Sequence, residues 1–278
     1  MYFPIQTPFA RRQGCQVSMA TGELLLTLTD ARLEGHLPFL WTRAYRSRAA
    51  AVDFGLGLGW AHPLQLQPGY RSHHASDGVL TALCDAYGNQ VFISRDTSGR
   101  IQRLGNGAGH ALHLRYEQDH IAAVDYQLQH GNAWSTRNTL VSYRYDALWR
   151  LIQATYANGE IEHYRYNEQH LMVERRLGTS ASLHWEWELH HNTARCIRYR
   201  GEPGPLDTRY AWQSDGRVSV QGMDGSHEEY VHDRFERLVQ RIDACGGEHF
   251  KSYDPQGRLA VEQAPSGEIT GAIVKSGV

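Results

Sequence analysis

An internal repeat of about 21 residues is the feature that most constrains how this chain can fold. Recognisable copies begin at Tyr145, Tyr166, Trp212, His232 and Tyr253, and the last three follow one another at steps of 20 and 21 residues. With degenerate copies upstream, from Arg95 and Tyr116, and an aromatic at Trp187, eight copies cover residues 95–278. Repetition at a fixed short period is typical of one small structural unit stacked many times.

Each well-formed copy carries two turn signals with a short run between them. The first is an Asp-x-x-Gly-Arg segment such as Asp254–Arg258, in which Asp accepts backbone N–H bonds and Gly takes positive φ. The second is a pair such as Asn158–Gly159 or Asp224–Gly225, which favours a type I′ turn with positive φ at both central residues. The runs between the turns alternate with period 2, so one repeat is predicted to be one β-hairpin, with Gly159, Gly225 and Gly257 at turns.

Because an isolated hairpin is marginally stable, the repeats must add side by side. We therefore predict an all-β fold, a long curved antiparallel sheet of consecutive hairpins with little helix. An N-terminal β domain is expected over residues 1–68, transitional strands over 69–94, and the hairpin array over 95–278. The repeated residues are interpreted as scaffold: Tyr145, Asp146, Tyr166, Asp233, Tyr253, Asp254, Gly257 and Arg258.

Charge and hydropathy argue against two classes of partner. The chain has 28 Lys and Arg against 30 Asp and Glu, a formal charge of −2, whereas binders of nucleic acids or membrane surfaces concentrate positive charge. No apolar run reaches the ~20 residues of a transmembrane helix, and the first twelve residues lack the apolar core of a signal peptide. We expect no nucleic-acid partner and no membrane partner.

Two separate motifs resemble one known family. The segment Tyr253–Leu259 looks like the YD repeat of Rhs (rearrangement hotspot) proteins and their tyrosine-rich relatives. Val17–Arg48, followed by the Gly-Leu-Gly-Leu-Gly-Trp loop at Gly55–Trp60, resembles the uncharacterised domain that precedes the repeats in those proteins. The resemblance covers nearly the whole chain, and its two motifs occur in the family's order.

The resemblance implies a shell. In Rhs-type polymorphic toxins such sheets spiral into a hollow β-cocoon that holds a variable C-terminal toxin, and many are delivered to competing bacteria by type VI secretion. It implies as partners the remainder of the shell, its toxin cargo, and a secretion-system spike and chaperone in the full-length context. It also implies export by a route that needs no signal peptide, or a cytoplasmic location for this piece produced alone.

The length suggests a truncated or partial member of that family. Eight hairpins supply about 16 strands, hence a sheet on the order of 77 Å wide, whereas a wall around a guest of about 130 residues needs a circumference of roughly 145 Å. The expectation is an open segment, about half of one turn of a cocoon, with no toxin domain of its own.

An enzyme is the first rival interpretation, because 16 His invite metal or acid–base hypotheses. The nearest zinc-like motif, His227–His232, has its second His one position too late and lies on a predicted strand. The four cysteines form no Cys-x-x-Cys pair, and no Ser, Cys or His has a nucleophile motif around it. We predict no catalytic residues, no metal site and no cofactor.

A carbohydrate-binding or adhesin-like protein of the cell surface is the second rival. Aromatic side chains exposed on a sheet can stack on sugar rings, and the candidates here are Trp185, Trp187 and Trp212. Their direction decides between the alternatives: rings in a solvent-exposed groove favour glycan binding, and rings packed against neighbouring repeats favour a scaffold.

Overall fold

A computed structural model describes residues 16–65, 71–178, 181–190 and 192–271. Within these ranges the regular structure is almost entirely β, with two short 3₁₀ turns at Ser47–Ala49 and Pro63–Gln65. No helix in the described part is long and apolar enough to cross a membrane. The chain divides into two compact units, the first built mainly from Leu25–Thr179 and the second from Ser180–Val278 together with Val17–Leu24.

The first unit contains a small N-terminal sheet and the first ten hairpin strands. The small sheet has four strands in the order β1 (Gln16–Val17), β2 (Leu24–Leu33), β3 (Phe39–Arg46) and β4 (Trp60–Ala61). The hairpin strands are β5 (Arg71–His74), β6 (Leu80–Cys84), β7 (Gln90–Arg95), β8 (Ile101–Gly105), β9 (His110–Glu117), β10 (His120–His130), β11 (Ala133–Tyr145), β12 (Leu151–Tyr156), β13 (Ile161–Tyr166) and β14 (Met172–Leu177).

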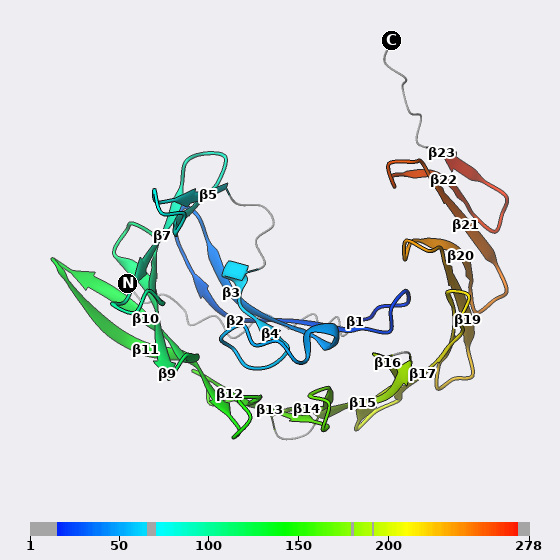
Figure 1. Ribbon diagram of the computed structural model, residues 1–278, viewed down its shortest axis with the longest axis horizontal. Helices are drawn as coiled ribbons and strands as arrows, with labels where there is room; N and C mark the ends of the chain where they lie inside the picture. The colour runs from blue at the N-terminus through cyan, green and yellow to red at the C-terminus, as the bar shows by residue number, and fades with distance from the viewer. Residues whose placement is uncertain (1–15, 66–70, 179–180, 191, 272–278) are drawn as a thin grey trace, which may run out of the picture. The chain divides into compact units, whose positions relative to one another are not determined.

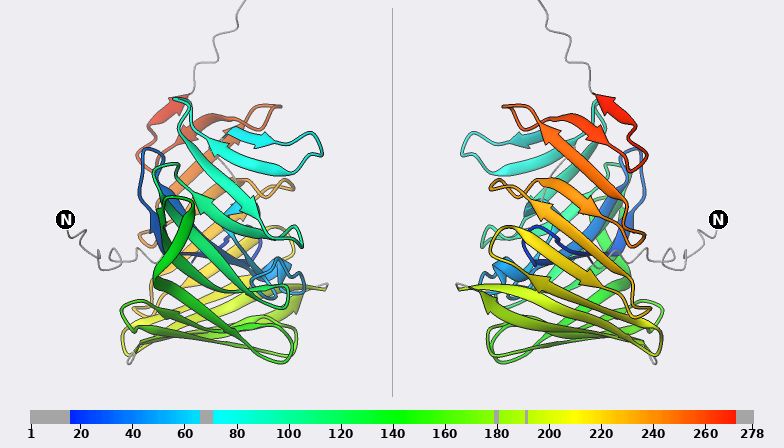
Figure 2. Two further views of the ribbon diagram at one scale, coloured as in Figure 1. Left: turned by 90° about the vertical axis from the view of Figure 1, so that its left-hand side faces the viewer. Right: turned by 90° about the vertical axis from the view of Figure 1, so that its right-hand side faces the viewer.

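The second unit contains nine further strands. They are β15 (Ala181–His190), β16 (Thr193–Glu202), β17 (Leu206–Trp212), β18 (Arg217–Gln221), β19 (His227–His232), β20 (Leu238–Ile242), β21 (Glu248–Tyr253), β22 (Leu259–Gln263) and β23 (Ile269–Gly271). Within each unit every hairpin strand pairs antiparallel with the next one along the chain, as Figures 1 and 2 show.

The prediction of an all-β chain of consecutive antiparallel hairpins is confirmed. Sixteen strands, β8 to β23, lie within the described part of residues 95–278, which is the number that eight hairpins require. The hairpin pattern also includes β5, β6 and β7, upstream of residue 95. The domain boundaries at residues 68 and 94 stay a prediction.

The predicted type I′ turn is wrong. At Asn158–Gly159 only the glycine has positive φ, at 82°, and the same holds for Asp224–Gly225. Tyr156 N–H donates to the Glu160 carbonyl and Gly159 N–H donates to the Tyr156 carbonyl. This is a three-residue loop, a type I turn that ends in a left-handed glycine bulge. The Asp-x-x-Gly-Arg turns close in the same way, with Gly257 at φ 80°, so both turns of the repeat share one geometry.

The two units differ in how their sheets are covered. In the first unit β2, β3 and β4 lie against one face of β11–β14 (Figure 1), and the layer between them buries Trp41, Tyr45, Trp60 and Tyr164 almost completely. In the second unit the later strands form a single layer, and every residue of β20 is half-buried. The polar and aromatic surplus of the sequence suits such a layer, because each side chain keeps contact with water at one end.

Candidate functional site

In several repeats the aspartate of the motif organises its own turn. Asp254 accepts the N–H groups of Gln256 and Arg258 through Oδ1, at 3.0 and 2.8 Å, and the Arg258 Nε through Oδ2 at 2.7 Å. The same three bonds occur at Asp233 with Arg237, and at Asp146 with Arg150. The Asp side chain therefore shapes the loop and also fixes the direction of the arginine.

That arginine contacts the tyrosine of the next repeat. The Arg237 guanidinium lies over the Tyr253 ring at 4.8 Å, and the Tyr253 hydroxyl donates to the carbonyl of Leu238 at 2.9 Å. The same arrangement joins Arg100 to Tyr116 and Ile101, Arg150 to Tyr166 and Leu151, and Arg195 to Trp212 and Cys196. We call this arrangement the Arg–Tyr link; it couples consecutive hairpins through a cation–π contact and a hydrogen bond.

These bonds set the ionisation of the groups involved. The hydrogen bond from Arg237 lowers the pKa of Asp233, and backbone N–H bonds lower it further. Burial raises the pKa of Tyr116 to about 12. Both groups therefore keep one protonation state near neutrality, the carboxylate ionised and the phenol neutral.

Three repeats depart from the glycine of the motif. Trp149, His170 and Glu236 occupy its place and keep the left-handed conformation, with φ of 58°, 61° and 62°. A side chain at such a φ costs free energy, and such residues persist where surrounding contacts hold them. Two of the three, Trp149 and His170, lie where N-terminal residues contact the repeats.

Trp149 anchors the loop that follows β3. Its ring stacks on His120 with centroids 4.2 Å apart and planes 1° apart, and His120 Nε2 lies 2.5 Å from Asp53 Oδ2 in that loop. A Cβ on Gly57 would lie 2.7 Å from the Trp149 carbonyl oxygen. The backbone of the Gly-Leu-Gly-Leu-Gly-Trp loop thus packs closely against the backbone of the repeat sheet.

Arg43 of β3 is the centre of a buried polar cluster. Its side chain is fully buried, as is that of Asp30 on β2, and Arg43 Nε lies 2.5 Å from Asp30 Oδ2. Arg43 also donates to the hydroxyls of Tyr164 at 2.8 Å and Tyr156 at 2.7 Å. The hydroxyl of Tyr143 donates to Asp30 at 2.6 Å. We call these five residues the Arg43 cluster; a buried ion pair needs such additional hydrogen bonds to offset its desolvation.

The cluster extends to the neighbouring strands of the repeat sheet. Glu162 on β13 accepts a bond from Arg175 on β14 at 3.0 Å, and both side chains are buried. Burial raises the pKa of Tyr143, and the nearby Asp30 raises it further. Burial opposes the charge of Arg43, yet Asp30 and the surrounding tyrosines raise its pKa well above the ordinary value. The stable state is an ion pair held inside neutral phenols.

Tyr166 joins the cluster region to the repeat pattern. Its hydroxyl accepts the indole N–H of Trp60 at 2.8 Å while donating to the Leu151 carbonyl at 2.7 Å. Beside it, Tyr45 accepts the Met172 N–H at 2.9 Å. One tyrosine of the motif therefore both links two hairpins and holds the N-terminal sheet. Sequence reasoning identified Tyr166 but missed Arg43 and Asp30.

The predicted sugar-stacking residues take three different positions in the second unit. Trp185 is 2% exposed and stacks on Tyr199 at 5.6 Å, which leaves no accessible ring face for a sugar. Trp212 donates its indole N–H to the Cys196 carbonyl and lies under Arg195. Trp187 is half-buried. Two of the three rings thus pack against neighbouring strands; sugar binding at Trp187 and Trp212 stays a prediction.

Little in the described part of the chain has the form of a metal or thiol site. Those residues contain no group of three or more His, Cys, Asp or Glu placed to hold a metal ion. His227–His232 forms strand β19. Cys84, Cys196 and Cys245 are free thiols, and Cys15 lies outside the described residues.

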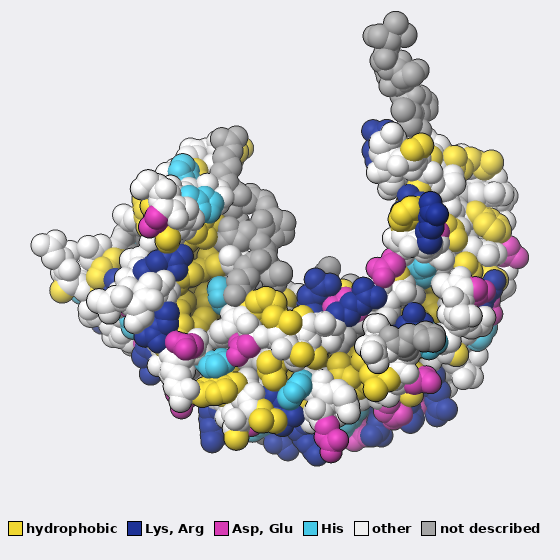
Figure 3. All heavy atoms as spheres, viewed as in Figure 1, with side chains coloured by type: hydrophobic (Ala, Val, Ile, Leu, Met, Phe, Trp, Pro, Cys, Tyr) yellow, Lys and Arg dark blue, Asp and Glu magenta, His cyan; other side chains and the backbone are white. Residues whose placement is uncertain are grey.

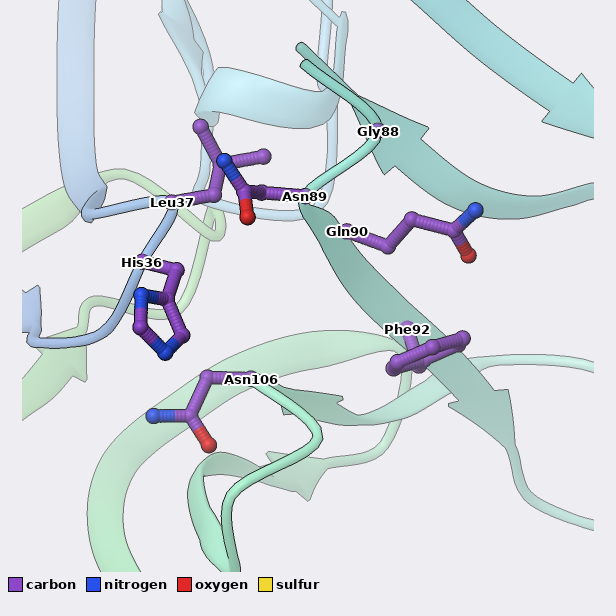
Figure 4. Close-up of a pocket in the computed structure, with 7 residues that line it drawn as sticks. All are labelled: His36, Leu37, Gly88, Asn89, Gln90, Phe92 and Asn106. Atoms are coloured by element: carbon purple, nitrogen blue, oxygen red, sulfur yellow. The ribbon is translucent and has the colours of Figure 1, made fainter.

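A shallow pocket of about 270 Å³ lies beside the loop between β2 and β3. Figure 4 shows its lining residues, which are His36, Leu37, Gly88, Asn89, Gln90, Phe92 and Asn106. The Asn106 amide donates to the Glu34 carbonyl at 2.6 Å, and the Asn89 amide donates to Asp85 at 2.8 Å. Both amides are engaged in loop structure, and the Gln90 side chain points away from His36 in Figure 4.

Comparison with known proteins gives a match to one domain model and to two curated proteins. Residues 14–91 match the model of a domain of unknown function, DUF6531. The probable deoxyribonuclease RhsB of Dickeya dadantii (strain 3937) is 22% identical over 313 residues, which covers 91% of this chain and 21% of that protein. The probable deoxyribonuclease RhsA of the same organism is 22% identical over 280 residues, 79% of this chain and 19% of that protein.

Solved structures of TcdB2-TccC3 are also similar. One covers 88% of this chain and 18% of its own, with a TM-score of 0.46 and 10% identity. Another, lacking the hypervariable C-terminal region, covers 90% of this chain with a TM-score of 0.34 and 12% identity. The chain spans about a fifth of the length of the curated relatives that it matches. The DUF6531 match and the similarity to RhsA and RhsB over most of the sequence support an assignment of this chain to the Rhs family.

Proposed function

We propose that this chain is a non-catalytic wall segment of an Rhs-type shell, which encloses or presents a toxin polypeptide for delivery to competing bacteria. The observation that carries the proposal is the use of the polar residues of the repeat. Arg237 donates to Asp233 within one turn, and its guanidinium lies over the Tyr253 ring of the next repeat. The Tyr253 hydroxyl in turn donates to the backbone beside Arg237. Residues that could do chemistry are thus used to join hairpins.

The Arg43 cluster supports the same interpretation. A catalytic ion pair has to meet its substrate, whereas the side chains of Arg43 and Asp30 are fully buried and hydrogen-bonded to tyrosines. The cluster lies between β3 and the repeat strands, where it holds the two layers of the first unit together. Its role is architectural.

The names of the relatives concern much longer proteins. RhsA and RhsB are named probable deoxyribonucleases, and this chain matches about a fifth of each. We place any deoxyribonuclease activity outside that matched fifth. The remaining shell, a toxin cargo, and a secretion-system spike with its chaperone are the expected partners, and export independent of a signal peptide is the expected route.

Protection from proteolysis tests the wall function. The chain is produced together with the polypeptide encoded directly downstream of it, and the mixture is treated with a nonspecific protease. Because the chain supplies only an open segment of a shell, the proposal predicts that the downstream polypeptide is digested more slowly when the chain is present than when it is absent. Arg43→Met, which disrupts the joined layers, is expected to reduce protection, whereas exposed Tyr87→Phe is not. Equal digestion with and without the chain would contradict the proposal.

A further inference from the structure

One face of β11–β14 points away from β2–β4 and carries a row of basic and polar residues. The strand registers place Arg144 opposite Gln153, Gln153 opposite His163, and His163 opposite Arg176. Figure 3 shows Lys and Arg side chains gathered on this side of the first unit. We call these four residues the basic row; it crosses four strands at nearly one level.

Two arginines of the basic row have no carboxylate partner. Arg144 and Arg176 are exposed, and no carboxylate of the described ranges lies within ion-pair distance of either. Nearby, Arg165 lies 3.1 Å from Glu174, and the turn arginines such as Arg150 pair with aspartate. Most of these neighbouring arginines are paired, whereas Arg144 and Arg176 carry positive charge that pairs with no carboxylate in the described part of the first unit.

His163 lies in the field of these arginines. Partial burial lowers its pKa, and Arg176 and Arg144 lower it further, against a smaller opposing effect of Glu174. The side chain is therefore neutral near pH 7, able to donate one hydrogen bond and accept another. A bound anion would offset the field and raise the pKa of His163.

We propose that the basic row binds a linear anionic polysaccharide, with one carboxylate at Arg144 and another at Arg176. Three strand spacings, about 14 Å, separate the backbones of the two arginines, so two carboxylates along one extended chain can each meet one arginine. The Gln153 amide and the His163 imidazole lie between them. Gln153 donates one N–H to the Thr155 hydroxyl at 2.9 Å, which leaves its second N–H, its carbonyl oxygen and the imidazole to bond sugar hydroxyls. Guanidinium groups suit carboxylates because they can donate two parallel hydrogen bonds.

The surroundings of the row favour a polysaccharide over a nucleic acid. Residues that flank it on the same face include Ser142, Thr155, Ile161 and Arg165, and none of these has an aromatic ring. Single-stranded nucleic acids are bound by stacking their bases on aromatic side chains, and duplexes by neutralising many phosphates. The hydroxyl side chains beside the two arginines suit a polysaccharide, whose sugar rings each carry hydroxyls and one negative charge, better than a nucleic acid.

The experiment measures binding of an oligogalacturonate of about ten rings to the full chain by calorimetry, with the pKa of His163 followed by NMR. His163→Gln assigns the resonance. Binding is expected to raise the pKa of His163 and to weaken with salt. The double variant Arg144→Gln/Arg176→Gln is expected to lose roughly tenfold in affinity, because it removes both charges that face the carboxylates of the ligand. The matched control Arg137→Gln/Arg209→Gln removes the same charge at exposed positions elsewhere.

Several results would overturn the proposal. Undetectable binding, or equal losses in the two double variants, would show that the row is not a site. Tighter binding of oligothymidylate or of oligoglutamate than of oligogalacturonate would assign the row to a nucleic acid or an acidic polypeptide. The circular dichroism spectrum of each variant shows whether it is folded, and a bound ligand without a change at His163 would place the site elsewhere. These outcomes are independent of the shell proposal, which the protease experiment tests.

Discussion

The guanidinium of Arg237 lies 4.8 Å from the centroid of the Tyr253 ring, and Tyr253 donates its hydroxyl proton to Leu238, the residue after that arginine. The tyrosine and the arginine of the motif therefore act in different copies of it. Three other Arg–Tyr links have the same form, one with Trp212 in place of tyrosine. The motif describes how one hairpin is joined to the next.

Removing the hydroxyl of Tyr253 should loosen this joint. Tyr253→Phe keeps the ring under Arg237 but loses the hydrogen bond to Leu238, which is worth about 1 kcal/mol. Native-state hydrogen exchange should show faster opening of β20–β22 and unchanged protection in the first unit. Tyr87→Phe is the control, because Tyr87 is 91% exposed. Equal protection in both variants would contradict the link.

The turn aspartates should make the hairpins sensitive to acid. The pKa of Asp233 is held below its ordinary value of 3.8 by Arg237 and by backbone N–H groups. A carboxyl whose pKa is lower in the folded state stabilises the fold fully above its unfolded pKa, and this stabilisation is lost as pH falls through the folded pKa. Asp233→Asn should therefore destabilise the second unit at pH 7 and flatten its loss of stability as pH falls below about 4.

Denaturant unfolding at several pH values measures that effect. Asn167 occupies the same place in another repeat and accepts two of the same backbone bonds, so asparagine is compatible with the turn. Asp119→Asn is the control, since the Asp119 side chain is 95% exposed. If the unfolding free energy of Asp233→Asn falls with decreasing pH as steeply as that of the wild type, the assignment is contradicted.

The Arg43 cluster should be a major contribution to the stability of the first unit. Arg43→Met leaves the buried Asp30 carboxylate without its cation, a change that typically costs about 3–5 kcal/mol. Adding Asp30→Asn removes the stranded charge and should recover part of the loss. Urea unfolding monitored by tryptophan fluorescence gives the free energies. A cost below about 1 kcal/mol, or strictly additive effects, would show that the pair is not coupled.

We expect the Trp149 ring to stabilise the first unit even though the backbone conformation of this residue is unfavourable. Trp149→Gly relieves the positive φ of 58° but removes the stack on His120, and we expect a net loss of stability with increased exchange at residues 53–59. Glu236→Gly relieves a similar φ of 62° without removing the stack on His120, and should stabilise by a few tenths of a kcal/mol. Stabilisation by both substitutions would exclude a docking role for Trp149.

The hairpin architecture was predictable because the information for it is local. Alternation and a glycine every ten or so residues locate strands and turns such as Gly159 and Gly257, whose φ is positive. The turn type was not predictable from Asn158–Gly159, because the dipeptide fits both a two-residue loop and a three-residue loop with a glycine bulge. Strand register, which the sequence leaves open, decides between them.

The contacts between distant segments could not be predicted from the sequence. Arg43 meets Tyr164 and Tyr156 across 121 and 113 residues, and no spacing rule relates them. The replacement of the motif glycine by Trp149 and His170 was a visible signal, since bulky residues at a left-handed position need compensating contacts. Trp185 was a candidate for sugar stacking because alternation alone does not tell which face of a sheet is covered.

The most direct test of the central claim, that this chain is wall and not enzyme, is a nuclease assay on the purified chain. Supercoiled plasmid is incubated with the chain and Mg²⁺ at a large excess of protein, with a reaction lacking protein beside it. The account predicts no cleavage above that blank, in wild type and in Arg144→Gln/Arg176→Gln alike. Plasmid cleavage that co-purifies with the chain and disappears on a single substitution in a folded variant would contradict it.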